Sequence, residues 1–171
     1  MSTTSTLVVR LPMLPDLVML IRRDHDDITT GLDLIVTTTA PVALLREGLD
    51  AVRLGFVVHA VAEERILSVL ARRQPLPVVT EIVRSSGADH LEQDALLGDL
   101  ADTEPGTAAW FTFATELRNT MLRHAACAEL MPTLLGGAVS MRLLTQLASS
   151  YATERMRVLA ATYPAQLGVA S

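Results

Sequence analysis

The residues of this sequence best suited to chemistry are histidines, two of which are followed by a carboxylate one helical turn later. His59 and Glu63 are four residues apart in the run HAVAEE, and His90 and Asp94 have the same spacing in DHLEQD. Side chains four residues apart on a helix lie about 40° from each other around its axis, so each pair can bind one centre. If both segments are helical, these spacings favour a metal site built from imidazole and carboxylate ligands.

The other two histidines extend this pattern. His25 lies in the run LIRRDHDDI, and His124 is followed at five residues by Glu129, about 140° around a helix and so less directly inward. The candidate metal ligands are therefore His25, His59, Glu63, His90, Asp94, His124 and Glu129. Imidazole and carboxylate together suit iron, with manganese or zinc less favoured. This set exceeds the needs of one tetrahedral ion and fits two metal ions bridged by carboxylates.

Length and composition predict one globular domain spanning residues 1–171. Half of the 171 residues are hydrophobic, which suffices for a sizeable core. The net charge of −5 disfavours nucleic acid as a partner. All 14 basic residues are arginines, so the sequence has no lysine for Schiff-base or nucleophilic chemistry.

The sequence predicts neither a membrane protein nor a secreted one. No apolar run approaches the roughly 18 residues that span a bilayer. The run MSTTSTLVVRLPML at the start lacks the basic residues and the small-residue cleavage site of a signal peptide. Cys127 is the only cysteine and cannot form an internal disulfide, which is compatible with reducing surroundings. We therefore expect no membrane partner and a cytoplasmic location.

The spacing of apolar residues predicts an all-α fold. Aromatic residues are only 4% of the chain, and apolar residues recur at three and four rather than alternating, which disfavours strands. Proline and glycine clusters separate segments long enough to be helices, which we expect at about 15–37, 41–73, 78–102, 107–131 and 138–162. The first four predict an antiparallel up-down-up-down four-helix bundle over about 15–131. The last predicts an additional C-terminal helix that packs across the bundle.

Each of the four predicted bundle helices carries one histidine on its apolar stripe. On the second helix, for example, the stripe runs through Phe56, His59, Glu63 and Ile66. In an antiparallel bundle the four histidines would lie about 7 to 14 residues from a common end, which agrees within roughly 10 Å along the axis. A single buried histidine is more often structural than a ligand, and four structural histidines stay an alternative. Unpaired polar groups in a core cost about 1–3 kcal/mol each, however, and a shared metal supplies the missing partner.

The four histidine segments together resemble the hemerythrin-like family, bacterial cation-binding domains of the HHE type. The resemblance covers roughly residues 15–135 and rests on four runs in this order: LIRRDHDDI, HAVAEERIL, ADHLEQDALL and LRHAACAELMP. In the last run, an acidic residue five positions after the histidine and a nearby proline are similar to the family pattern. The resemblance implies a non-haem di-iron centre inside the bundle, with an oxo or hydroxo bridge between the irons.

The resemblance also implies a role for each ligand. His25 and His59 would hold one iron, and His90 and His124 would hold the other. Glu63 and Glu129 would bridge the two irons. At the position of Asp94 the oxygen-carrying members of the family have a second histidine in this helix. Other members have a carboxylate there, as this sequence does. If Asp94 turns away from the site, Gln93 or Tyr151 could fill its position.

A di-iron centre of this kind would bind or activate O₂ or peroxide. An anionic carboxylate at Asp94 in place of imidazole would stabilise oxidised iron and so disfavour reversible carriage of O₂. Two functions stay open: an oxidoreductase (an oxidase, peroxidase or catalase-like enzyme) with a small organic substrate, or a binding or sensing module for O₂, NO or iron. The sequence names no substrate, does not decide whether the protein is an enzyme, and leaves a homodimer open.

Three residues near the histidines have plainer interpretations. Cys127 is predicted to be a small buried core residue rather than a redox group. Asp24 lies about 100° from His25 around the helix, so solvation or a hydrogen bond that supports a ligand is expected. Glu64 is expected to point away from the site and to pair at the surface.

Overall fold

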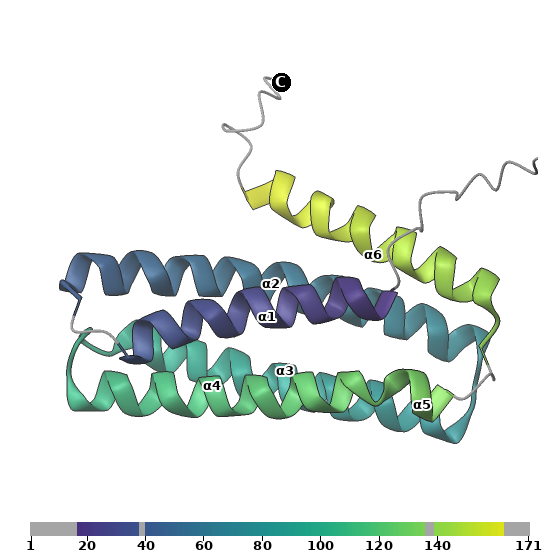
Figure 1. The fold of residues 1–171 in the computed structure, drawn as a ribbon, viewed down its shortest axis with the longest axis horizontal. Coiled ribbons are helices and arrows are strands. Elements are labelled where there is room, and N and C mark those ends of the chain that lie inside the picture. The colour runs from purple at the N-terminus through teal and green to yellow at the C-terminus, as the bar shows by residue number, and fades with distance from the viewer. Residues whose placement is uncertain (1–16, 38–39, 136–138, 163–171) are drawn as a thin grey trace, which may run out of the picture.

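The computed structural model of the chain describes residues 17–37, 40–135 and 139–162 (Figure 1). Within these ranges every regular element is a helix and no strand occurs, which confirms the predicted all-α class. The helices are α1 (Leu17–Thr37), α2 (Val42–Arg73), α3 (Pro77–Asp102), α4 (Ala108–Glu129), α5 (Met131–Leu135) and α6 (Met141–Thr162). None of these described helices combines the length and the apolar composition needed to cross a bilayer.

The predicted helix bounds agree closely with the observed ones. α2 and α3 each begin within one residue of the predicted start and end at the predicted residue. The predicted starts at residues 15 and 138 lie outside the described residues. The fourth helix differs, because α4 ends at Glu129 and the chain turns at Leu130 before the short α5. Pro132 has no N–H to donate to the carbonyl of Ala128, so α4 would lose a hydrogen bond by continuing through it.

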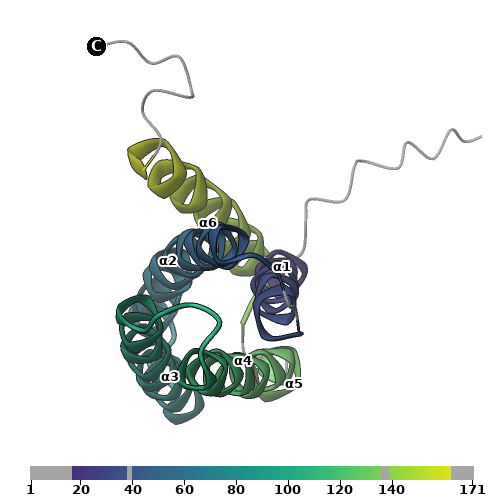
Figure 2. The ribbon, with the colours of Figure 1, turned by 90° about the vertical axis from the view of Figure 1, so that its left-hand side faces the viewer.

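Four long helices, α1 to α4, form a ring around a shared core (Figure 2). The chain reverses direction between consecutive helices of this ring (Figure 1). α2 and α4 each contact both α1 and α3, while α6 lies outside the ring and packs against α2 and α1. The chain is therefore a helical bundle with an additional C-terminal helix on one side.

The buried apolar side chains fall into two clusters on either side of one polar layer. One cluster contains Leu17 and Ile21 of α1, together with buried residues of α2 and α6. The other begins at Ile28 of α1 and contains Trp110 of α4, which is only 1% exposed. His25 lies between Ile21 and Ile28 on the same face of α1, so the polar layer divides the core.

Close packing of α1 against α2 brings two of the histidine-bearing helices together. A Cβ atom added to Gly31 would lie 2.8 Å from Cγ2 of Val52, and one added to Gly48 would lie 2.6 Å from Cγ2 of Ile35. A larger residue at either position would force the facing side chain or its helix to shift, so glycine permits this close packing. The short separation lets imidazoles from α1 and α2 meet inside the bundle.

Candidate metal centre

Each of the four bundle helices contributes one histidine to a buried cluster, and α2 adds a glutamate. His25 comes from α1, His90 from α3 and His124 from α4. His59 and Glu63 lie one turn apart on α2. All five side chains are at most 3% exposed, because they occupy inward positions on their helices. The four histidines thus meet at one level of the bundle, as their places on the apolar stripes predict.

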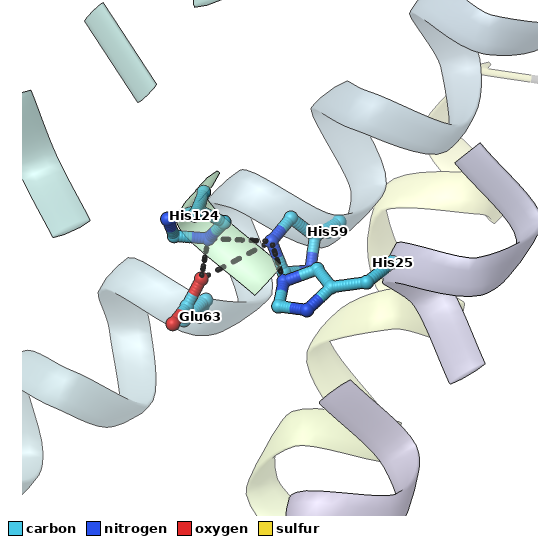
Figure 3. A group of neighbouring side chains, drawn as sticks. All are labelled: His25, His59, Glu63 and His124. Atoms are coloured by element: carbon cyan, nitrogen blue, oxygen red, sulfur yellow. Dashed lines mark hydrogen bonds and ion pairs between the residues drawn. The ribbon is translucent and has the colours of Figure 1, made fainter. Parts of the chain in front are cut away.

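The donor atoms of the cluster lie at nearly equal separations. Glu63 Oε2 is 3.1 Å from both His59 Nε2 and His124 Nε2, and it is 3.2 Å from His90 Nε2. His59 Nε2 is also 3.1 Å from His25 Nε2 and 3.4 Å from His124 Nε2. Figure 3 shows four of these side chains pointing toward one another from three helices. One atom from each of these four lies within 4.8 Å of all the others.

A hydroxyl group from α6 fixes the orientation of His59. Tyr151 is fully buried, and its Oη lies 3.0 Å from His59 Nδ1 and donates to Asp24 Oδ2 at 2.5 Å. Asp24 also pairs with Arg155 Nη2 at 2.7 Å, so its carboxylate accepts from both neighbours. Since the Tyr151 proton goes to Asp24, Tyr151 Oη accepts the proton that His59 Nδ1 carries. Burial and the nearby Asp24 raise the pKa of Tyr151, which keeps the phenol protonated.

Carboxylates hold two further imidazoles in the same way. His90 Nδ1 lies 3.2 Å from Glu64 Oε1, and His124 Nδ1 lies 3.2 Å from Asp89 Oδ2. Because a carboxylate can only accept, Nδ1 carries the proton in both rings. The neutral form of each ring therefore presents an unprotonated Nε2 atom to the cluster, which is the form that binds a metal ion.

Protons alone cannot satisfy the cluster. Burial lowers the pKa of His25 to about 3 and also lowers the pKa of His59, so both rings are neutral near pH 7. Burial disfavours charge on His124, but its contacts with Glu63 and Asp89 outweigh this and raise its pKa. Burial likewise opposes ionisation of Glu63, yet the hydrogen bond from a protonated His124, together with the contacts of His59 and His90, holds its pKa well below the usual range.

Two Nε2 atoms, those of His59 and His90, still have no proton to share with Glu63 even if His124 carries a second proton. His59 Nε2 and Glu63 Oε2 face each other with lone pairs at 3.1 Å. His90 Nε2 is buried and has no hydrogen-bond partner among the described residues. Buried polar atoms are rarely left in this state, and a cation can serve as their shared partner.

A metal ion fits the spacing of the donor atoms. Two ligand atoms at about 2.1 Å from a metal are about 3.0 Å apart at a right angle and about 3.4 Å apart at the tetrahedral angle. The separations of 3.1, 3.2 and 3.4 Å in the cluster fall within this range or next to it. The group formed by His25, His59, Glu63 and His124 can therefore hold a metal ion, and His90 adjoins it through Glu63.

Two of the predicted ligands, Asp94 and Glu129, lie outside the cluster. Asp94 is exposed, because the buried face of α3 runs from His90 to Gln93. Steps of three and four both fit the apolar pattern there, and burying an amide costs less free energy than burying a carboxylate. Glu129 pairs with Arg22 at 2.5 Å on the surface, since a residue five positions beyond an inward one lies about 140° around the helix. Neither position supports the predicted ligand role.

The two residues considered as substitutes for Asp94 are both fully buried. Gln93 is fully buried, and neither its Oε1 nor its Nε2 has a hydrogen-bond partner within the described residues. Tyr151 contacts His59 at Nδ1, the ring nitrogen that faces away from the cluster. Asp24 accepts from Tyr151 and so contacts His59 only indirectly.

Two supporting residues were missed by the sequence interpretation, and one was placed correctly. Asp89 and Arg155 each bind a group on a different helix, and no spacing within their own helices signals such a contact. Glu64 lies at the surface as expected, where it accepts from His90 Nδ1.

The prediction for Cys127 is wrong, because this residue is exposed. The inward face of α4 passes from His124 to the half-buried Ala128, a step of four where the prediction used a step of three, and the next buried residue is Met131 of α5. Cys127 lies instead at the edge of a cavity between α3, α4 and α5.

This cavity of about 290 Å³ reaches the cluster, since Glu63 and His124 line it. A structural metal site is closed by its ligands, whereas a reactive one keeps a position open to small molecules. The arrangement is thus a buried nitrogen and oxygen ligand set that a small molecule can approach. Comparisons with protein-family models, curated proteins and solved structures found no match for this chain.

Proposed function

We propose that this chain is a non-haem di-iron protein of the hemerythrin-like type that binds or activates O₂ or peroxide inside its helical bundle. One observation carries the proposal: five imidazole and carboxylate donors from all four bundle helices meet in a buried layer. The order of the histidine segments along the chain supports it further. Iron suits this mixture of borderline and hard ligands better than manganese or zinc does.

In this proposal His25 and His59 would hold one iron ion and His90 and His124 the other, with Glu63 as a ligand available to both. The contacts of Glu63 Oε2 with the Nε2 atoms of three histidines support a shared carboxylate. Bound iron would supply the exchange of electrons with O₂ or peroxide, which the side chains of this site cannot perform alone.

The residues around the ligands orient them and exclude water. Tyr151, Glu64 and Asp89 each accept the Nδ1 proton of one ligand histidine, which turns its Nε2 atom inward. Two apolar clusters close the layer along the axis of the bundle. Charge interactions inside the layer are therefore screened by little water and are stronger than at the surface.

The number of ligands favours a reactive centre over a closed one. Because Asp94 and Glu129 lie at the surface, two ions would share five protein donors, fewer than the sequence predicts. The cavity beside Glu63 and His124 supports access by a small molecule to the remaining positions. These features favour an oxidase or peroxidase over a binding or sensing module for O₂, NO or iron. The exposed position of Asp94 removes the argument that its carboxylate lowers the potential of the metal.

Anaerobic reconstitution of the purified chain with ferrous iron tests the proposal, with bound iron measured per chain. We expect two ions per chain, and loss of iron in His59→Ala and Glu63→Ala while the helical circular dichroism persists. Asp94→Ala and Glu129→Ala are matched controls, since each removes a carboxylate outside the cluster, and both should keep the wild-type iron content. Full occupancy in the first two variants would refute the ligand set, and one ion per chain would refute the two-ion arrangement.

The reaction with O₂ distinguishes an enzyme from a carrier. The reduced, iron-loaded chain is mixed with O₂ and followed by absorption spectroscopy. Rapid oxidation that degassing does not reverse is the expected result and supports an oxidoreductase. Uptake of O₂ that degassing reverses would instead indicate a carrier or sensor. A chain that takes up no iron would mean that the histidines are structural.

A further inference from the structure

The cavity between α3, α4 and α5 changes in character from its outer to its inner end. Its apolar walls are formed by Val78, Ile82, Ala128, Leu130, Met131 and Leu134. Leu130 and Leu134 are about half exposed, whereas Glu63 and His124 are almost fully buried. The cavity is therefore a passage from the surface to the metal centre, apolar along its length and polar at its inner end. Its volume of about 290 Å³ is close to the lower limit of small-molecule sites, about 300 Å³.

The charges along this passage select against an anion. Apart from His124 and Cys127, the ionisable residues that line it are the acids Glu63, Glu81 and Asp89, and no arginine is among its lining residues. In the metal-free chain a carboxylate or phosphate would meet the like charges of Glu63 and Asp89, whereas Glu81 is already paired with Arg84. A ligand that carries an ammonium group would be repelled by the metal of the proposed centre. An uncharged molecule is compatible with the passage in both states.

Two neighbouring serines line the passage and differ in one respect. Ser85 Oγ donates to the carbonyl of Ile82 at 3.2 Å, so its hydroxyl already has a partner. Ser86 is only 5% exposed, and its Oγ has no hydrogen-bond partner among the described residues. Because buried hydroxyls are normally paired, the Ser86 hydroxyl is available for a molecule in the passage. Ser86 lies one turn before the ligand His90 on the buried face of α3.

We propose that this cavity binds an uncharged, mainly apolar small molecule with one hydroxyl or similar polar head, which Ser86 holds at the inner end. The inference rests on the proposed function, since this molecule would be the organic substrate of the metal centre. Its apolar body contacts Ile82 and Met131, and its head lies beside Glu63 and His124. A primary alcohol of medium chain length has this chemistry.

Binding of 1-hexanol to the metal-free chain tests the cavity without reliance on iron. We expect saturable binding by calorimetry, with shifts in the methyl NMR signals of Ile82 and Met131. Ser86→Ala should weaken binding about two- to tenfold, the factor that corresponds to one lost hydrogen bond. Ser85→Ala is the matched control and should bind like wild type, because it removes a hydroxyl that already has a partner. Hexanoate, which has the same length and a negative charge, should bind more weakly than 1-hexanol.

Three results would overturn the inference: hexanol shifts neither methyl signal, the two serine variants bind equally well, or hexanoate binds as tightly as hexanol. Paramagnetic relaxation then tests the orientation of the ligand. In protein loaded with Mn²⁺, compared with protein loaded with Zn²⁺, the protons beside the hydroxyl of hexanol should relax faster than those of its terminal methyl.

The two proposals fail in different ways. If the chain takes up metal but hexanol shows no relaxation gradient, the inference is overturned while the metal centre stands. If the chain takes up no metal but binds hexanol in a manner that depends on Ser86, the cavity is supported as a ligand site and the proposed iron function is overturned.

Discussion

The buried hydroxyl of Tyr151 allows a direct test of how the ligands are oriented, through the substitution Tyr151→Phe. Phenylalanine keeps the ring that packs inside the bundle and removes one oxygen atom. His59 Nδ1 then loses its partner at 3.0 Å at a site with no exposed surface, so water cannot readily replace the hydroxyl. Asp24 keeps its ion pair with Arg155, which limits the loss mainly to His59.

The expected magnitudes follow from burial. Loss of the group that orients a ligand histidine lowers metal affinity about 10- to 100-fold, or about 1.4–2.7 kcal/mol. In the metal-free chain, the unpaired Nδ1–H of His59 should lower the free energy of unfolding by about 1–3 kcal/mol. Asp89→Ala and Glu64→Ala are matched comparisons, because these side chains hold two other ligand imidazoles but are 34% and 58% exposed. Water can replace them, so the loss of affinity should decrease from Tyr151 to Asp89 to Glu64.

The assay is competition for Zn²⁺ against a chromophoric chelator, since zinc is not oxidised during the titration. Urea denaturation of the metal-free chains gives the free energies of unfolding. Wild-type zinc affinity in Tyr151→Phe would refute the role assigned to the hydroxyl. A larger loss in Glu64→Ala than in Tyr151→Phe would refute the reasoning from burial, even if both variants bind more weakly.

Other substitutions test the bundle around the site. Asp94→His should leave the iron content unchanged, because residue 94 faces solvent, and a third ion per chain or a changed iron spectrum would contradict this. Gly48→Ala should lower the free energy of unfolding by about 1–3 kcal/mol, since the added methyl would lie 2.6 Å from Cγ2 of Ile35. The methyl added by Gly98→Ala would meet nothing within 4 Å, so this change should raise the free energy of unfolding by about 0.5–1 kcal/mol. Equal effects of the two substitutions in urea denaturation would exclude the packing argument. Thr107→Ala should lower the free energy of unfolding by about 1 kcal/mol, because the Thr107 hydroxyl caps α4 by accepting a first-turn N–H at 3.2 Å. An unchanged midpoint of thermal denaturation would mean that the cap contributes nothing to stability.

The positions of the helices and the burial of the histidines could be predicted because both depend on local pattern. Pro41 precedes α2 and Pro77 begins α3, where the missing N–H costs nothing. The step of four from His59 to Glu63 sits within a long apolar stripe on both sides, so both side chains are buried as expected.

The choice between steps of three and four could not be predicted in the same way. On α3 both Gln93 and Asp94 continue the stripe beyond His90, and on α4 both Cys127 and Ala128 are compatible with it. Which one faces inward depends on how the helices cross, and that angle arises from packing along their whole length. The contact of Tyr151 with His59 could not be predicted either, because the two residues lie 92 positions apart in the sequence.

The proposed ligands come from four different helices, so a metal centre there would link the lifetime of the protein to its metal supply. An unfolded chain cannot bring these side chains together, so a metal that binds only the folded form stabilises it, by about 2.7 kcal/mol at a free concentration one hundred times the Kd. Chains made when the metal is scarce would then unfold more often and be degraded sooner by proteases. The amount of this protein in a cell would follow the availability of the metal without any change in its synthesis.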